Sequence, residues 1–304
     1  MTVKLVHTIG SHVELRLDDA LLHRYVYCPA ADQRESPRPY FHPLRTLAGE
    51  TVTIYRPHDH LWHHGLSMTM AQLSGENFWG GPTYVRDEGY VQQANNGRIA
   101  HLGWRELSAE HMVEDLRWVT QDERAVLDEV RDMRLLGPDR DGGWWGLDLS
   151  FRLTNVSGSP LVFGSPTTQG RPQAGYGGLF WRGPRSFLHG SILAGGGLQG
   201  PETMGRQATW IAFEGRHDGT AAGSTIAFVD SPGNPRHPTQ WFVREDPYAC
   251  VSASFMYDRE LELGAGEVLS LRYAVVIAAG AWAAERIDEV ARRVAPPGDR
   301  PPPA

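Results

Sequence analysis

The 304-residue sequence predicts a mainly β protein, a large antiparallel β-sandwich with a C-terminal helix. Several short segments alternate apolar and polar residues, which places one face of a strand in a core. Glycine and proline, present 34 and 21 times, favour turns between such segments. There is no visible repeat of about 20–50 residues and no GxGxxG segment between a strand and a helix, which disfavours propellers, solenoids and nucleotide-binding α/β folds.

Five segments predict strands. Residues 147–154 show the alternation most clearly, and the turn sequence NVSGSP follows them. Asp18 and Asp19 mark a turn after the first segment. In chain order, the predicted strands cover residues 13–17, 52–54, 147–154, 226–229 and 269–277.

One segment, residues 281–294, predicts a helix because its apolar residues recur at helical spacing. The sequence APPGDRPPPA ends this helix and predicts a disordered tail over residues 296–304. Residues 120–133 are ambiguous between a helix and an exposed strand. Because apolar residues make up 41% of the chain, we expect one sandwich domain over residues 1–295.

Composition argues against several classes of partner. The net charge is −7 and no basic stripe is present, which argues against nucleic acid. The longest apolar run, residues 273–279, is too short to span a bilayer, and the N-terminal residues lack the pattern of a signal peptide. Cys28 and Cys250 do not make a disulfide framework. We therefore expect a cytoplasmic protein with no membrane partner, and assembly into homo-oligomers stays open.

The sequence RPHDHLWHHG, residues 56–65, places four of the 13 histidines within seven residues. They are His58, His60, His63 and His64, and Asp59 stands between the first two. Crowded imidazoles lower one another's pKa, and a neutral imidazole can bind a metal or accept a proton near neutral pH. The cluster therefore predicts a functional site, although each histidine taken alone could simply hydrogen-bond the loop.

Two kinds of chemistry fit this cluster. In the first, His60, His63 and His64 act as acid–base groups. In the second, His60, His64 and His42 bind one divalent transition metal such as zinc, manganese, iron or nickel, because imidazole is a common ligand of these ions. The residues alone leave both open, together with a protein that needs no cofactor.

Three further segments carry polar residues typical of binding sites. Arg45 follows His42, and its planar guanidinium suits carboxylates and hydroxyls. Arg182 ends the glycine-rich sequence GYGGLFWR. The loop DSPGNPRHPTQWFVRED is fixed by prolines and adds four candidates. These four are Asn234, His237, Trp241 and Arg244.

The segments RPYFHPLRTLAGETVTIYRPHDHLWHHGLSM, GYGGLFWR and SPGNPRHPTQWFVRED resemble motifs of the bacterial PmoA-like family of unknown function. The resemblance spans about residues 38–279 and implies a soluble, β-rich protein of carbohydrate metabolism, not the membrane methane monooxygenase subunit. Many relatives have a glutamate where this chain has Gln169. The resemblance therefore adds Gln169 to the candidates and puts acid–base chemistry at that position in doubt.

Three functions follow as hypotheses. The first is an enzyme that acts on a sugar, keto-sugar or glycoside as a lyase, epimerase or hydrolase, by histidine or metal-assisted chemistry. The second is an iron- or copper-dependent oxygenase, and the third a non-catalytic carbohydrate-binding protein. All but the second take a small carbohydrate as partner, for which ten tryptophans and ten tyrosines offer flat surfaces. The predicted catalytic residues are His60, His63, His64, Arg45 and Arg182, and the predicted substrate-binding residues are His42, Asn234, His237, Trp241, Arg244 and Gln169.

Overall fold

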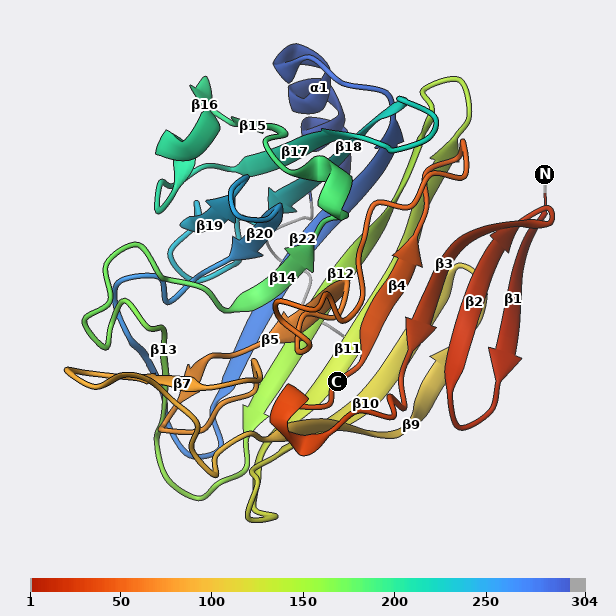
Figure 1. Cartoon of the computed structure of the whole chain (residues 1–304). Coiled ribbons are helices and arrows are strands. Elements are labelled where there is room, and N and C mark those ends of the chain that lie inside the picture. Colours follow the sequence, from red (N-terminus) through yellow and green to blue (C-terminus); the bar gives the residue numbers. More distant parts are fainter. Residues whose placement is uncertain (1, 296–304) are drawn as a thin grey trace.

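The computed structural model describes residues 2–295, in which two large antiparallel sheets stack face to face (Figure 1). The mainly β class, the sandwich and the C-terminal helix that the sequence predicts are confirmed. The predicted tail over residues 296–304 lies outside the described residues.

One large sheet has eight strands and includes the N-terminal strands. Its strands, in spatial order, are β1 (Val3–Thr8), β2 (His12–Leu17), β3 (Ala20–Val26), β4 (Tyr40–Leu44), β5 (Leu66–Thr69), β14 (Gly178–Arg182), β20 (Cys250–Ala253) and β19 (Trp241–Arg244). The strands at the β19 end come from distant parts of the chain, so this end brings separate segments together.

The other large sheet has nine strands and contains the longest ones. Its strands, in spatial order, are β16 (Leu198–Gln199), β15 (Ser191–Ala194), β17 (Trp210–Arg216), β18 (Gly223–Asp230), β22 (Val268–Ala279), β12 (Trp144–Asn155), β11 (Ala125–Asp139), β10 (His111–Val119) and β9 (Arg98–Leu107). Long ladders between β11, β12 and β22 form its centre.

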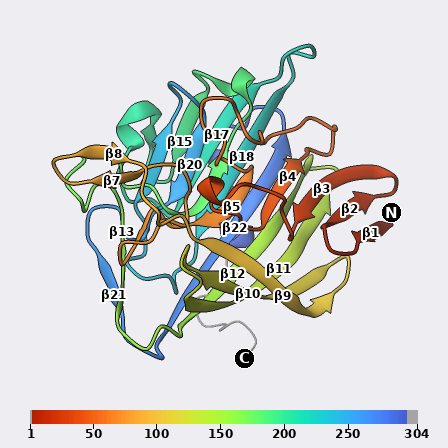
Figure 2. The ribbon, with the colours of Figure 1, turned by 60° about the horizontal axis from the view of Figure 1, so that its bottom comes forward.

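Smaller elements complete the described chain, and the short sheets lie at the end of the sandwich away from β1 in both views (Figures 1 and 2). One short sheet holds β21 (Leu261–Leu263), β13 (Leu161–Gly164) and β6 (Gln72–Leu73), and the other holds β7 (Thr83–Val85) and β8 (Gly89–Val91). Three short 3-10 helices span Gln33–Glu35, Arg185–Phe187 and Gly200–Thr203.

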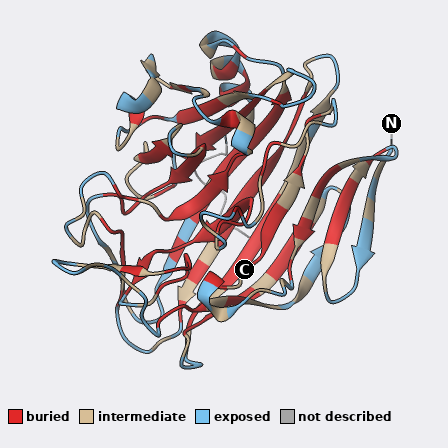
Figure 3. Ribbon diagram, in the orientation of Figure 1, coloured by how far each residue is buried: buried red, intermediate tan, exposed pale blue. Residues whose placement is uncertain are grey.

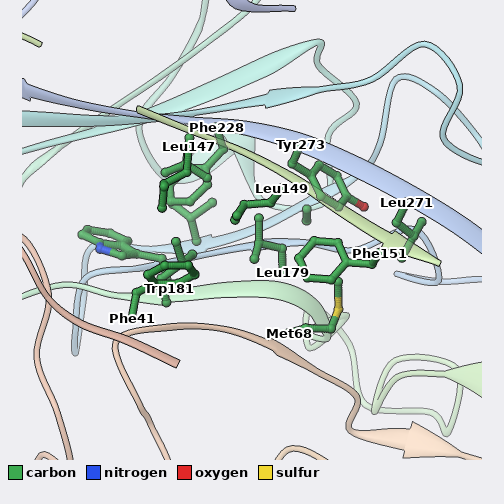
Figure 4. Packing of buried hydrophobic residues seen from close by; sticks show 14 of the residues in the cluster. Phe41, Met68, Leu147, Leu149, Phe151, Leu179, Trp181, Phe228, Leu271 and Tyr273 are labelled. Atoms are coloured by element: carbon green, nitrogen blue, oxygen red, sulfur yellow. The ribbon is translucent and has the colours of Figure 1, made fainter. Parts of the chain in front are cut away.

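The main core fills the space between the two large sheets, because the pleat of each strand sends alternate residues to one side. In β12, Leu147, Leu149 and Phe151 point into this space, and β14 contributes Leu179 and Trp181 from the opposite sheet (Figure 4). Buried residues run along both sheets, whereas many connecting loops are exposed (Figure 3). The residues between these core-facing positions therefore point to the outer face of each sheet.

A second cluster covers the outer face of the nine-stranded sheet, where α1 (Ala284–Val294) packs. Ile287, Val290 and Ala291 of this helix are buried, and Trp210 of β17 belongs to the same cluster. The helix predicted over residues 281–294 is confirmed, with a start at residue 284 because Ala283 has an extended backbone.

Four of the five predicted strands are confirmed as parts of β2, β12, β18 and β22. The ambiguous residues 120–133 contain the start of β11 and are therefore no helix. The strand predicted over residues 52–54 is wrong. The Val52 amide donates to the Leu44 carbonyl of β4, whereas the Ile54 amide donates to the Arg182 carbonyl of β14, so no continuous ladder forms.

Membrane insertion through a helix has no candidate in the described chain. None of the helices found between residues 2 and 295 has the length and apolar character that a crossing requires.

We expect Ile287→Ala to lower the free energy of unfolding by about 2–4 kcal/mol, because it removes a fully buried side chain between α1 and the sheet. Urea denaturation measures the change. The matched control is Arg292→Ala on the exposed side of the same helix, where only an ion pair with Asp288 is lost and a change below about 0.5 kcal/mol is expected. Equal losses in the two variants would contradict the packing described for α1.

Candidate active site

The segment of residues 56–65, called the histidine loop below, is shaped by two consecutive turns. The His60 amide donates to the Pro57 carbonyl at 3.0 Å, and the His63 amide donates to the His60 carbonyl at 3.0 Å. A bridge between Tyr55 and His64 closes the loop. His60 and His63 thereby lie on one side, with ring centroids 4.5 Å apart and planes only 16° from parallel.

Gly65 connects this loop to β5 and has a φ of +48°. A Cβ atom at this position would collide with the Phe41 carbonyl oxygen of the adjacent strand β4. Glycine is therefore required for the loop to pass this close to the sheet.

A buried carboxylate holds the loop from beneath. Glu35, whose side chain is only 4% exposed, accepts two hydrogen bonds from Arg56, at 2.7 and 2.9 Å, and one from His64 Nε2 at 3.0 Å. Arg38 lies beside it and donates to the carbonyl oxygens of Glu35 and Trp62. These bonds satisfy the polar groups of an irregular segment that has few ladder partners of its own.

His64 is neutral and structural in this arrangement. Burial lowers the pKa of His64 to about 4, although the hydrogen bond with Glu35 raises it. Both partners of its Nε2, the Glu35 carboxylate and the Leu61 carbonyl, are acceptors, so Nε2 carries the proton. Its side chain is fully buried.

Arg182 organises the loop from the other side. Its side chain, 2% exposed, donates from Nη2 to Asp59 Oδ2 at 2.8 Å and from Nη1 to His63 Nδ1 at 2.7 Å. The guanidinium also lies 3.9 Å from the centre of the Tyr248 ring. Because a guanidinium has only donors, His63 Nδ1 is the acceptor and the proton of this imidazole lies on Nε2. Burial holds the pKa of His63 well below its usual range, so the ring is neutral.

Asp59 fixes the opposite tautomer of His60. Burial raises the pKa of Asp59, but hydrogen bonds from Arg182 and His60 outweigh it and hold the pKa of this carboxyl well below its usual range. The ionised carboxylate accepts from His60 Nδ1 at 2.9 Å and from Arg185 at 3.0 Å. Burial lowers the pKa of His60, partly opposed by Asp59, so this ring is neutral and has a lone pair on Nε2.

The two stacked imidazoles therefore present different groups. His60 Nε2 is an acceptor and His63 Nε2 is a donor, and neither atom has a hydrogen-bond partner within residues 2–295. A lone pair beside a neutral donor can accept a proton from a bound molecule and hydrogen-bond one of its oxygen atoms.

Both rings line a cavity of about 430 Å³ on the outer face of the eight-stranded sheet. Phe180 of β14 and Phe242 of β19 point to this face, because their neighbours Trp181 and Trp241 point into the core. The cavity is lined by His60, Trp62, His63, Trp79, Gly80, Pro82, Tyr90, Arg171, Tyr176, Phe242, Arg244, Pro247 and Tyr248. Its size and its mixture of rings and few polar groups are typical of small-molecule sites.

The structure brings four of the predicted residues together. His60, His63 and Arg244 line the cavity, and Arg182 contacts His63 directly behind it. His64 lies beneath the loop on Glu35 and does not line the cavity, so the structure assigns it a structural place and not the predicted catalytic one.

His42 and Arg45 do not line the cavity, where the sequence predicted a substrate-binding and a catalytic group. His42 is hydrogen-bonded to Thr53 and stacks on Tyr55. Arg45 lies after β4, and its carbonyl oxygen accepts from Trp145. Tyr55 in turn contacts His64, so His42 approaches the loop of residues 56–65 through Tyr55 and not from the cavity.

The remaining candidates also lie elsewhere. Asn234 donates to Asp230 and to a backbone carbonyl, and His237 bonds to the same Asp230, so both stabilise their own loop. Trp241 donates to the Ala208 carbonyl in the core. Gln169 donates to Glu260 at 3.2 Å outside the cavity.

Sequence reasoning missed several lining residues. Arg171 and Tyr248 stand alone in loops with no pattern around them, so no sequence signal indicated them. Phe242 could have been found, because strand alternation places residues 242 and 244 on one face and residue 241 on the other.

The predicted metal ligands do not fit a metal as a set. His42 bonds to Thr53, His60 to Asp59 and His64 to Glu35. Among the residues that the structure describes, no group of three or more His, Cys, Asp or Glu side chains is arranged to hold a metal ion. Metal binding by these residues stays an untested prediction.

The chain matches the model of a family of unknown function, DUF6807, over residues 12–292, and it belongs to this family. The resemblance to the PmoA-like family is therefore wrong, although the expected β-rich character agrees with the fold. The resemblance rested on three motif segments within residues 38–279, whereas the family model matches residues 12–292 as a whole. No curated protein sequence matches this chain.

Solved structures with a similar arrangement include three carbohydrate-related proteins. A GH36 α-galactosidase from Geobacillus stearothermophilus in complex with raffinose is 13% identical, with a TM-score of 0.41 over 92% of this chain. This chain spans only 41% of that enzyme's length. A putative aldose 1-epimerase from Escherichia coli is 9% identical (TM-score 0.35, 93% of this chain and 99% of that one). An aldose epimerase homologue from C. elegans is 8% identical (TM-score 0.32, 92% and 98%). At these TM-scores the likenesses carry no argument about substrate or reaction.

We expect His64→Gln to flatten the pH dependence of stability between pH 7 and pH 5. The unfolded imidazole titrates near 6.5 and the folded one near 4, so the unfolded chain binds more protons in this window and stability is lost as pH falls. His64 accounts for about 2 kcal/mol of that loss, which glutamine cannot reproduce because it does not titrate. Urea denaturation at the two pH values measures the difference.

The control for this experiment is His7→Gln on the exposed edge strand β1, which removes a histidine that is not buried. A His64→Gln variant with the same slope as the wild type would show that His64 is not buried as a neutral group.

Proposed function

We propose that this protein is an enzyme that uses acid–base chemistry on a small carbohydrate, with proton abstraction beside a carbonyl as its central step. One observation carries the proposal, the pair of stacked imidazoles with opposite tautomers, His60 and His63, at the wall of an aromatic cavity. The aromatic rings support a carbohydrate ligand, because flat rings pack well against the C–H faces of sugars.

The residues have distinct roles in this step. His60 Nε2 takes the proton from carbon, and the C–H electron pair forms a C=C bond as the carbonyl electrons move to oxygen. His63 Nε2–H donates a hydrogen bond to the developing enolate oxygen, as a neutral imidazole can. Asp59 stabilises the imidazolium that forms on His60. Return of the proton from His60 to the same face gives exchange, delivery of a proton from water to the other face gives an epimer, and transfer of the His60 proton to a hydroxyl on the neighbouring carbon gives elimination of water.

Arg182 is a positioning residue in this scheme. It does not line the cavity, but it fixes both Asp59 and the tautomer of His63. Its burial excludes water from these bonds and strengthens them.

We expect His60→Gln to lower proton exchange by on the order of 10²-fold or more, because the variant has no base at that position. Proton NMR in D₂O, with a panel of keto-sugars and sugar acids, measures deuterium uptake at the carbon beside the carbonyl. The side chain of His60 is 30% exposed, so the variant should fold, which its melting temperature checks.

The control for the exchange assay is His7→Gln, whose side chain lies on β1 far from the cavity and should leave exchange unchanged. Absence of exchange by the wild type on every compound of the panel would count against an enzyme and favour a non-catalytic carbohydrate-binding protein.

We expect Asp59→Asn to shift the acid limb of the pH–rate profile to lower pH and to reduce the plateau rate by on the order of 10²-fold. The Asp59 carboxylate raises the pKa of His60, so its loss lowers that pKa further and protonation of the base then requires more acid. The rate falls because an amide turned toward His60 can hold the wrong tautomer. An acid limb that moves upward would contradict the role given to Asp59.

A further inference from the structure

The charged residues that line the cavity are both arginines and therefore positive. Arg171 and Arg244 line it together with His60 and His63, and no carboxylate is among the described residues that do so. The protein as a whole carries a net charge of −7, so a cationic cavity runs against its overall charge.

Ring contacts show where the two guanidinium groups lie relative to the imidazoles. His63 contacts Trp79 with centroids 5.4 Å apart, and Trp79 contacts Tyr176 at 4.5 Å. The Tyr176 hydroxyl then hydrogen-bonds to that of Tyr90 at 2.8 Å. Arg171 sits over the Tyr90 ring at 4.9 Å and donates to its hydroxyl. Trp79, Tyr176 and Tyr90 together form an aromatic wall of the cavity. This wall separates Arg171 from the imidazoles.

Arg244 reaches the same region from β19. Its guanidinium lies 5.3 Å from the Phe242 ring, which contacts Tyr176 at 5.4 Å. Within residues 2–295, its guanidinium makes one long hydrogen bond, from Nη2 to the Gln173 carbonyl at 3.5 Å. Each guanidinium group therefore lies beside an aromatic residue that contacts Tyr176.

Neither guanidinium has a carboxylate partner among residues 2–295, although both are half-buried. A cation held in a partly desolvated cavity without a counter-ion attracts an anion strongly. Most of the five donors on each group stay available, in a fork that matches carboxylate and phosphate oxygens.

We propose that the ligand of this cavity is an anionic sugar, whose carboxylate or phosphate binds Arg171 and Arg244 while its reacting carbon lies at His60 and His63. This inference rests on the proposed function and names its substrate class. The cavity volume of about 430 Å³ suits a molecule of monosaccharide size. The anion fixes one end of the sugar, and the aromatic wall between the two ends orients the ring.

The test is a binding titration followed by the fluorescence of Trp62 and Trp79, which line the cavity. The probes are glucose, glucuronate and glucose 6-phosphate. At least one of the two anions should bind on the order of 10-fold or more tightly than glucose, and added salt should weaken it. The tighter anion identifies whether a carboxylate or a phosphate is recognised.

The variants Arg171→Gln and Arg244→Gln should each weaken anion binding by about 10-fold or more, and any loss of glucose binding should be smaller. The control Arg216→Gln replaces an exposed arginine outside the cavity and should bind like the wild type. Equal affinity for all three probes, an anion preference that survives both substitutions, or no anion binding at about 10 mM would overturn the inference.

The His60→Gln variant separates this inference from the proposed function. It should keep the anion preference while proton exchange is lost. An anion preference in a wild-type protein that exchanges no proton counts against the proposed chemistry alone. Proton exchange without any anion preference counts against the anionic substrate alone.

Discussion

The geometry of the site depends on the position of one buried guanidinium, that of Arg182. Its backbone is tied to the histidine loop on both sides, because its amide donates to the Gly65 carbonyl and its carbonyl accepts from Ile54. A guanidinium that is 2% exposed requires a counter-charge, and Asp59 supplies it. The bonds that satisfy this cation also fix which nitrogen of His63 carries a proton, so electrostatic pairing and tautomer selection are one constraint.

The buried Glu35 carboxylate supports the same loop through a second set of bonds. Glu35 binds Arg56 and His64, while Arg38 donates to nearby carbonyl groups. The loop has only turn and bridge hydrogen bonds of its own, so these charged groups replace the ladder that a strand would have. The crowded histidines consequently have different surroundings. His64 is buried against Glu35, whereas His60 and His63 line the cavity.

Sequence alone predicted the sheet class, most strands and the C-terminal helix, and it placed a candidate site at the histidines. It could not separate the histidines, because roles within a turn depend on which partner each ring meets in three dimensions. Trp241 shows an avoidable error, since strand alternation already excludes it from the face of Arg244. Arg171 and Tyr248 show the unavoidable kind, because they reach the cavity from loops whose course is set by tertiary contacts.

The two faces of β14 and β19 explain why the site is built on this edge of the sandwich. In β14, Leu179 and Trp181 pack in the core, while Phe180 faces the site and Arg182 reaches the histidine loop. Core packing of the inner residues therefore fixes the position of each strand. The outer residues of the same strand are positioned with it. A one-residue slip would exchange the two faces and place Arg182 in an apolar core, where no carboxylate could reach it. The packing that stabilises the fold is thus also what holds the guanidinium against Asp59 and His63.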